Sequence, residues 1–217
     1  MLPLKDSQPT NKPPIWVFTL IAANILIFLW QFTGNTKEII DQFALIPSKI
    51  NFSDYASLFP FISSQFLHGS ILHLLSNLWF LWIFGDNVEE RLGFIKFPLV
   101  YLLSGIAGAY AQYFFMPESS IPMLGASGAI AGILGAYFAW FPHHTVKSLV
   151  GIPFFGFGIF DIPASIMLLY WIGSQVLFGI GNILPGQDAG GVAYFAHIGG
   201  FLAGYLLAKL ITTTNTY

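Results

Sequence analysis

Hydrophobic residues along the chain form six long runs, separated by polar and charged residues. The runs cover roughly residues 15–33, 70–85, 97–116, 124–141, 162–182 and 191–211. A helix needs about 20 apolar residues to cross a hydrocarbon core of about 30 Å, and most of the runs approach that length. The pattern predicts an all-α polytopic membrane protein with six transmembrane helices.

The domain organisation follows from the same pattern. We expect a six-helix domain over 15–211, a short N-terminal tail over 1–14 and a short C-terminal tail over 212–217. Hydrophobic residues make up 55% of the chain and charged residues 8%, whereas a soluble domain carries about 25% charged residues. The lipid bilayer is therefore an expected partner.

Positively charged residues predict the orientation of the chain, because lysine and arginine are enriched in cytoplasmic loops. With the N-terminus inside, six of these residues are cytoplasmic: Lys5, Lys12, Arg91, Lys96, Lys147 and Lys209. Two are outside: Lys37 and Lys49. The distribution favours a topology with both termini in the cytoplasm.

Two reactive side chains lie inside the apolar runs. A polar group in hydrocarbon costs several kcal/mol unless it is hydrogen-bonded, so such a group suggests a function. Ser127 precedes Phe141 by 14 residues and His197 precedes Lys209 by 12, which places them about 20 Å and about 18 Å from the inner face. The serine and the histidine are therefore predicted to lie in the same layer of the membrane.

Serine becomes a strong nucleophile when a neighbouring base takes its proton, and histidine is suited to that role near neutral pH. No carboxylate lies in the middle of an apolar run. We therefore predict a catalytic dyad of Ser127 and His197 with no acidic third member. The alternative is that Ser127 only packs in a helix interface, where small polar residues are common.

Pairs of glycines accompany both side chains. Gly128 and Gly132 are four residues apart, as are Gly200 and Gly204. This spacing lets the backbones of membrane helices approach closely. We predict that the helices carrying Ser127 and His197 pack directly against each other.

A third group of polar residues begins the second apolar run. His73 and Asn77 are four residues apart, so they share a helix face and reach about the depth of Ser127. An imidazole and an amide there can donate hydrogen bonds to an oxyanion. His68 would point about 140° away from His73 in one helix, so we expect it to brace the preceding loop.

Several other functions lack their residues. The net charge of −2 provides no basic surface for nucleic acid, and the absence of cysteine excludes disulfides and thiolate metal sites. The His-Glu-x-x-His spacing of a zinc protease is missing, as is a pair of membrane aspartates. We expect no metal, no cofactor and no nucleic-acid partner.

Three motifs resemble those of one protein family. Gly125-Ala126-Ser127-Gly128 resembles the GxSx nucleophile motif of the rhomboid intramembrane serine proteases, and the sequence from Ala196 to Gly204 resembles their AHxxGxxxG motif. The spacing of His68, His73 and Asn77 is similar to their second-segment motif. The motif order and the six runs also agree, over roughly residues 15–211.

The resemblance implies a function and roles for these residues. Ser127 would be the nucleophile and His197 the general base, while His73, Asn77 and the Ser127 backbone N–H would form the oxyanion hole. Loop 34–68 would be embedded in the membrane, and the fifth helix together with the loop after it would form the substrate gate. Substrates would be single-span membrane proteins cut near the outer surface, in a bacterial or archaeal plasma membrane.

One departure from the family pattern concerns the base. Some rhomboids carry a tyrosine four residues after the serine that stacks on the histidine, and here that position is Ala131. Another group must therefore orient His197. The alternatives to a protease are a non-catalytic rhomboid-like protein that binds transmembrane helices and, less in keeping with the pattern, a small-molecule carrier.

Overall fold

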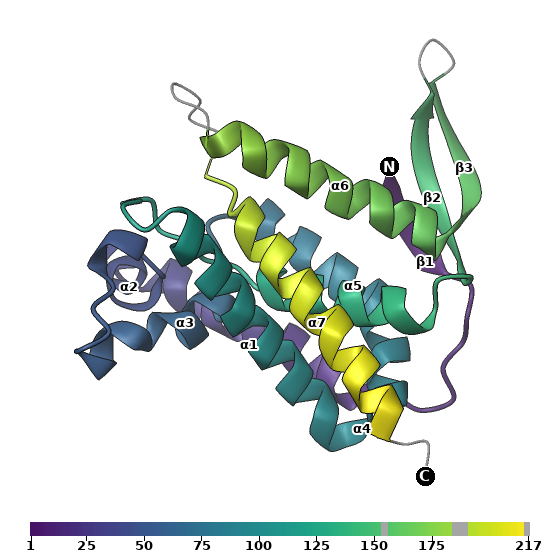
Figure 1. Cartoon of the computed structure of the whole chain (residues 1–217), viewed down its shortest axis with the longest axis horizontal. Helices are drawn as coiled ribbons and strands as arrows, with labels where there is room; N and C mark the ends of the chain where they lie inside the picture. Colours follow the sequence, from purple (N-terminus) through teal and green to yellow (C-terminus); the bar gives the residue numbers. More distant parts are fainter. Residues whose placement is uncertain (153–155, 184–190, 215–217) are drawn as a thin grey trace.

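The computed structural model describes residues 1–152, 156–183 and 191–214. The chain is mostly helical, and its long helices pack side by side (Figure 1). Five long helices lie within these described ranges: α1 (Ile15–Thr33), α4 (Ile71–Phe115), α5 (Ser127–Trp140), α6 (Ala164–Ile183) and α7 (Tyr194–Thr214). Between α1 and α4 lie α2 (Thr36–Phe43), α3 (Pro60–Ser63) and three short 3₁₀ helices, Pro47–Lys49, Tyr55–Leu58 and Ser64–Phe66.

Four of the described helices are long and apolar enough to cross a membrane: α1, α4, α6 and α7. α5 is apolar but shorter, with 14 residues. α4 is 45 residues long and is interrupted at Gly93, whose φ of 74° is in the region that favours glycine. The break separates 71–92 from 94–115, which correspond to the second and third apolar runs. The chain is thus an integral membrane protein with several apolar helices.

The expectation of an all-helical chain is wrong in one respect. An antiparallel sheet joins β1 (Leu2–Asp6), β2 (Thr145–Ile152) and β3 (Gly156–Pro163), in that order. β1 comes from the expected N-terminal tail, whereas β2 and β3 form a hairpin between α5 and α6. Sequence periodicity did not reveal this sheet, because the pairing of β1 with β2 joins segments about 140 residues apart.

Hydrogen bonds from buried polar groups attach β1 and α1 to the bundle. The Asp6 carboxylate accepts hydrogen bonds from the Tyr137 hydroxyl at 2.5 Å and from Asn87 Nδ2 at 2.8 Å. The Glu89 carboxylate accepts the backbone N–H groups of Trp16 and Val17, both at 2.9 Å. Because these N–H groups begin α1 and have no acceptor in their own helix, Glu89 stabilises the start of α1.

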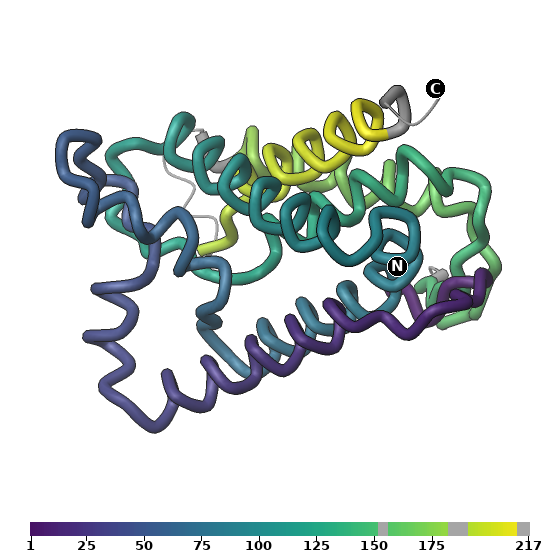
Figure 2. The backbone as a smooth tube through the Cα atoms, turned by 90° about the horizontal axis from the view of Figure 1, so that it is seen from below, coloured from purple at the N-terminus to yellow at the C-terminus, as the bar shows by residue number. Residues whose placement is uncertain are grey.

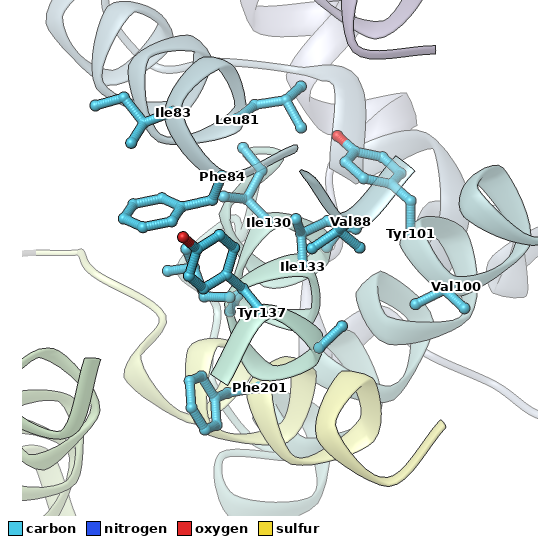
Figure 3. Close-up of a cluster of buried hydrophobic side chains, with 14 of the residues drawn as sticks. Leu81, Ile83, Phe84, Val88, Val100, Tyr101, Ile130, Ile133, Tyr137 and Phe201 are labelled. Carbon is cyan, nitrogen blue, oxygen red and sulfur yellow. The ribbon is translucent and has the colours of Figure 1, made fainter. Parts of the chain in front are cut away.

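The core lies where α4, α5 and α7 meet. Figure 3 shows Phe84, Tyr137 and Phe201, from these three helices, packed within one cluster of buried side chains. The ring centroids of Phe84 and Tyr137 are 5.1 Å apart with their planes nearly perpendicular, which is a favourable aromatic arrangement. The helices that carry the predicted site residues are thus held by a continuous apolar core.

The sheet and the α2–α3 region lie at opposite ends of the bundle. In Figures 1 and 2, β1 and the C-terminal part of α7 lie toward the same end, and α2 and α3 toward the other. Figure 2 also shows α1 running alongside the first half of α4. Ser127, His73 and His197 all lie at or near the starts of their helices.

α5 and α7 touch through their backbones at the glycine pairs. A Cβ atom added to Gly200 would lie 2.0 Å from the Gly128 carbonyl oxygen, and one added to Gly204 would lie 1.9 Å from the Gly132 oxygen. Real Cβ atoms do not approach oxygen so closely, so any side chain here would force the helices apart. Glycine therefore sets the distance between the helices of the serine and the histidine.

Replacing Gly200 by alanine should destabilise the protein, because the added methyl group overlaps the backbone of α5. Overpacking of this kind costs about 1–3 kcal/mol. Gly173→Ala in α6 is the matched control, since an added Cβ there meets nothing within 4 Å and alanine is the better helix former. Thermal unfolding in one detergent compares them; a Gly200→Ala protein as stable as the wild type would contradict the close packing.

Candidate active site

The starts of three helices and the middle of a fourth surround one cavity. It has a volume of about 740 Å³ and is lined by residues from α4, α5, α6 and α7, including His73, Asn77, Ser127, Gln175 and His197. These side chains come from positions up to 124 residues apart in the sequence. The packing of the bundle brings them together.

Ser127 and His197 form a direct hydrogen bond. The Ser127 Oγ lies 2.8 Å from His197 Nε2, which is within the reach that a base needs to take the serine proton. The similar depths calculated from the sequence are consistent with this contact. The pair has the geometry of a nucleophile and its general base.

The backbone at the start of α5 adds a donor beside the serine. Ser127 is the first residue of the helix, so its backbone N–H has no acceptor within the helix. The positive end of the helix dipole also lies here and favours a developing negative charge. The serine therefore carries both a nucleophile and a donor for an oxyanion.

A second donor comes from Asn77 on α4. Within the part of the chain that the structure describes, Asn77 Nδ2 is buried and has no hydrogen-bond partner. A buried amide without a partner is unfavourable unless a ligand satisfies it. Asn77 therefore fits a role in binding an oxygen of a substrate.

His73 occupies the first turn of α4, which begins where the Ser70 hydroxyl accepts the His73 backbone N–H at 3.1 Å. A serine in this position caps a helix. The imidazole lies against Gly125, where an added Cβ would lie 2.8 Å from His73 Nε2 and 3.6 Å from Asn77 Nδ2. Gly125 also has a φ of 129°, so both its conformation and the space favour glycine.

His68 lies closer to His73 than the sequence suggested. α4 begins at Ile71, so the two histidines do not share one helix, and their ring centroids are 5.2 Å apart. The Gln31 side chain bonds both the N–H and the carbonyl of His68, at 3.1 and 2.8 Å. Burial lowers the pKa of His68 to about 4.

The sequence analysis missed the two residues that hold His197. Gln175 Oε1 lies 2.7 Å from His197 Nδ1. The ring centroids of Trp171 and His197 are 5.7 Å apart, and the two ring planes are inclined by 33°. Both come from α6 and share a helix face. Gln175 lies 11 residues after the start of α6, about 16 Å along the helix. The helical rise that placed Ser127 and His197 in the membrane therefore also places Gln175 near their depth. An amide is not the residue type expected beside the base, because a carboxylate holds the histidine in a Ser-His-Asp triad.

Among the described residues, no group of three or more histidine, aspartate, glutamate or cysteine side chains is placed to hold a metal ion.

Comparison with known proteins identifies the family. The model of the Rhomboid domain matches residues 55–214. The chain belongs to the rhomboid family. Among its relatives, this rhomboid protein is 34% identical to RHOMBOID-like protein 4 of Arabidopsis thaliana over 72% of the chain, and 32% identical to the human presenilin-associated rhomboid-like protein, mitochondrial, over 85%. It is 29% identical over 93% of the chain to Rhomboid protein 1, mitochondrial, of Saccharomyces cerevisiae.

The relatives are longer proteins. The chain covers 34% of the Arabidopsis protein, 50% of the human protein and 55% of the yeast protein. All three relatives are eukaryotic, and the human and yeast proteins are named as mitochondrial proteins. They do not support the expected bacterial or archaeal plasma membrane, whereas they agree with an integral membrane protein of the rhomboid family.

Proposed function

We propose that this rhomboid protein is an intramembrane serine endopeptidase that hydrolyses peptide bonds in the transmembrane segments of membrane proteins, near the outer surface. The observation that carries the proposal is the 2.8 Å hydrogen bond between Ser127 Oγ and His197 Nε2. The unpartnered, buried Asn77 amide beside the same cavity supports it.

The proposed reaction has two halves. Ser127 Oγ attacks the carbonyl carbon of the substrate while His197 Nε2 takes the hydroxyl proton, and the carbonyl oxygen becomes an oxyanion. The Ser127 N–H, Asn77 Nδ2 and the His73 ring donate hydrogen bonds to it. The C–N bond then breaks as His197 gives its proton to the leaving amine, which leaves an acyl-enzyme on Ser127. In the second half a water molecule attacks the acyl carbon while His197 takes its proton, and the ester bond breaks as His197 returns that proton to Ser127 Oγ.

We also propose that the active domain has six membrane spans over 15–211, with both short tails, 1–14 and 212–217, in the cytoplasm. Support comes from α1, the two halves of α4, α5, α6 and α7, and from the common end toward which β1 and the end of α7 lie. With both termini in the cytoplasm, six of the eight lysine and arginine residues lie on the cytoplasmic side, as the positive-inside rule favours. In this arrangement the Ser127–His197 pair lies toward the outer side.

The experiment that tests the function combines a serine-directed probe with a substrate assay. The full chain, purified in detergent, is incubated with a fluorophosphonate and with a model single-span substrate, in EDTA and without ATP. We expect labelling of Ser127 and cleavage within the substrate's transmembrane segment. A protein that binds the transmembrane substrate but is neither labelled nor able to cleave it would support the non-catalytic alternative instead.

A further inference from the structure

A buried amide side chain reaches the proposed base from α6. Gln175 is 8% exposed, and its Oε1 lies 2.7 Å from His197 Nδ1, on the side of the imidazole opposite to Ser127. Three side chains from three helices thus form one line of hydrogen bonds, from Gln175 through His197 to Ser127.

The remaining bonds of the amide fix which of its ends faces His197. Gln175 Nε2 donates to Ser174 Oγ at 3.0 Å and to the Trp171 carbonyl at 3.4 Å, both in the same helix. The NH₂ group therefore has acceptors within α6, and Oε1 is left to point at the imidazole. This arrangement distinguishes the two orientations of the amide by its neighbours.

The amide orientation determines which imidazole nitrogen carries the proton. A carbonyl oxygen only accepts hydrogen bonds, so His197 Nδ1 must be the protonated nitrogen. Neutral His197 then has its lone pair on Nε2, facing the Ser127 hydroxyl at 2.8 Å. This is the tautomer that can take the serine proton.

We infer that Gln175 is a positioning residue that forms a triad with His197 and Ser127 and holds His197 in its base tautomer. This inference rests on the proposed function. Gln175 occupies the place of the acidic third member that the sequence lacks. A neutral amide does so without the cost of burying a carboxylate in a membrane helix.

The two side chains that orient the imidazole on the side away from Ser127 both come from α6. α6 packs chiefly against α7, and it supplies Gln175 and the ring of Trp171 to His197. The orientation of His197 therefore depends on the packing of α6 against α7.

Two substitutions at one position test the triad. Gln175→Leu keeps the approximate size but removes the acceptor, and we expect kcat to fall about ten- to hundredfold, as for loss of one orienting hydrogen bond, with KM little changed. Gln175→Glu restores an acceptor oxygen and should recover much of kcat. Val176→Ala, at a partly exposed neighbouring position, is the control for general disturbance of α6 and should keep wild-type kcat.

A spectroscopic measurement tests the tautomer without relying on catalysis. ¹⁵N spectra of histidine-labelled protein, with the His197 signal identified by its loss in His197→Gln, should show a proton on Nδ1 in the wild type. In Gln175→Leu the Nε2-protonated tautomer should appear. Unchanged tautomer and unchanged kcat in a folded Gln175→Leu protein would overturn the inference, as would equal losses of kcat in Gln175→Leu and Val176→Ala.

The two proposals fail in different ways. A wild-type protein that neither reacts with the fluorophosphonate nor cleaves a substrate contradicts the peptidase function, while the Nδ1-protonated spectrum would still support the role of Gln175 in orienting His197. If the wild type is active but Gln175→Leu changes neither the His197 tautomer nor kcat, only the proposed triad is contradicted.

Discussion

Replacing Ser127 by alanine is expected to abolish cleavage and fluorophosphonate labelling while the protein stays folded. The substitution removes only the hydroxyl group that lies 2.8 Å from His197 Nε2. In serine proteases, loss of the nucleophile lowers kcat by up to about 10⁶. Alanine is also a good helix residue, so the start of α5 should be preserved. Initial cleavage rates of a single-span substrate measure the effect.

The control for this variant is Ser148→Ala. Ser148 is fully buried and lies in β2, where its hydroxyl donates a hydrogen bond to the Val146 carbonyl. It should lose little activity per folded molecule. Cleavage by Ser127→Ala at close to the wild-type rate would show that another residue is the nucleophile.

Asn77→Ala is expected to slow the chemical step far more than it weakens substrate binding. The Asn77 amide is buried without a partner in the described part of the chain, so its donor is available to the oxyanion, which forms only during the reaction. Loss of one such donor typically lowers kcat by about 10²–10³. The Ser127 N–H remains, so some activity should persist.

Asn24→Ala is the matched control for the loss of a buried asparagine. Asn24 lies in α1 and donates to the Leu20 carbonyl at 2.7 Å, away from the cavity. We expect it to lower the melting temperature without a comparable loss of kcat per folded molecule. If folded Asn77→Ala retains wild-type kcat, Asn77 has no part in oxyanion binding and His73 must be tested alone.

Much of the helical framework could be predicted from the sequence, because long apolar runs in a membrane protein have few alternatives to helices. α1 occupies Ile15–Thr33, the run predicted first. The break at Gly93 divides α4 near the boundary expected between two runs. The sheet could not be predicted in this way, since β1 pairs with a hairpin far along the chain and no local periodicity reveals the partner.

In the candidate site, too, some features could be predicted from the sequence and others depend on contacts between helices. The motifs identified Ser127 and His197, and their depths followed from the helical rise, which is a local property of the backbone. The orientation of His197 depends instead on Gln175 and Trp171, which a different helix brings to the imidazole. His68 approaches His73 because α4 begins at Ile71, between the two histidines, and periodicity placed that boundary only roughly.

The sequence by itself therefore determined the membrane class, the family resemblance and the pair of reactive side chains, because apolar length and motif spacing are local properties. The tertiary structure alone decided which group holds the base, which donors have no partner and how β1 is anchored. Those features depend on contacts between α4, α5, α6 and α7, where a shift of about 1 Å would break a hydrogen bond and where glycines such as Gly200 set the distance between backbones.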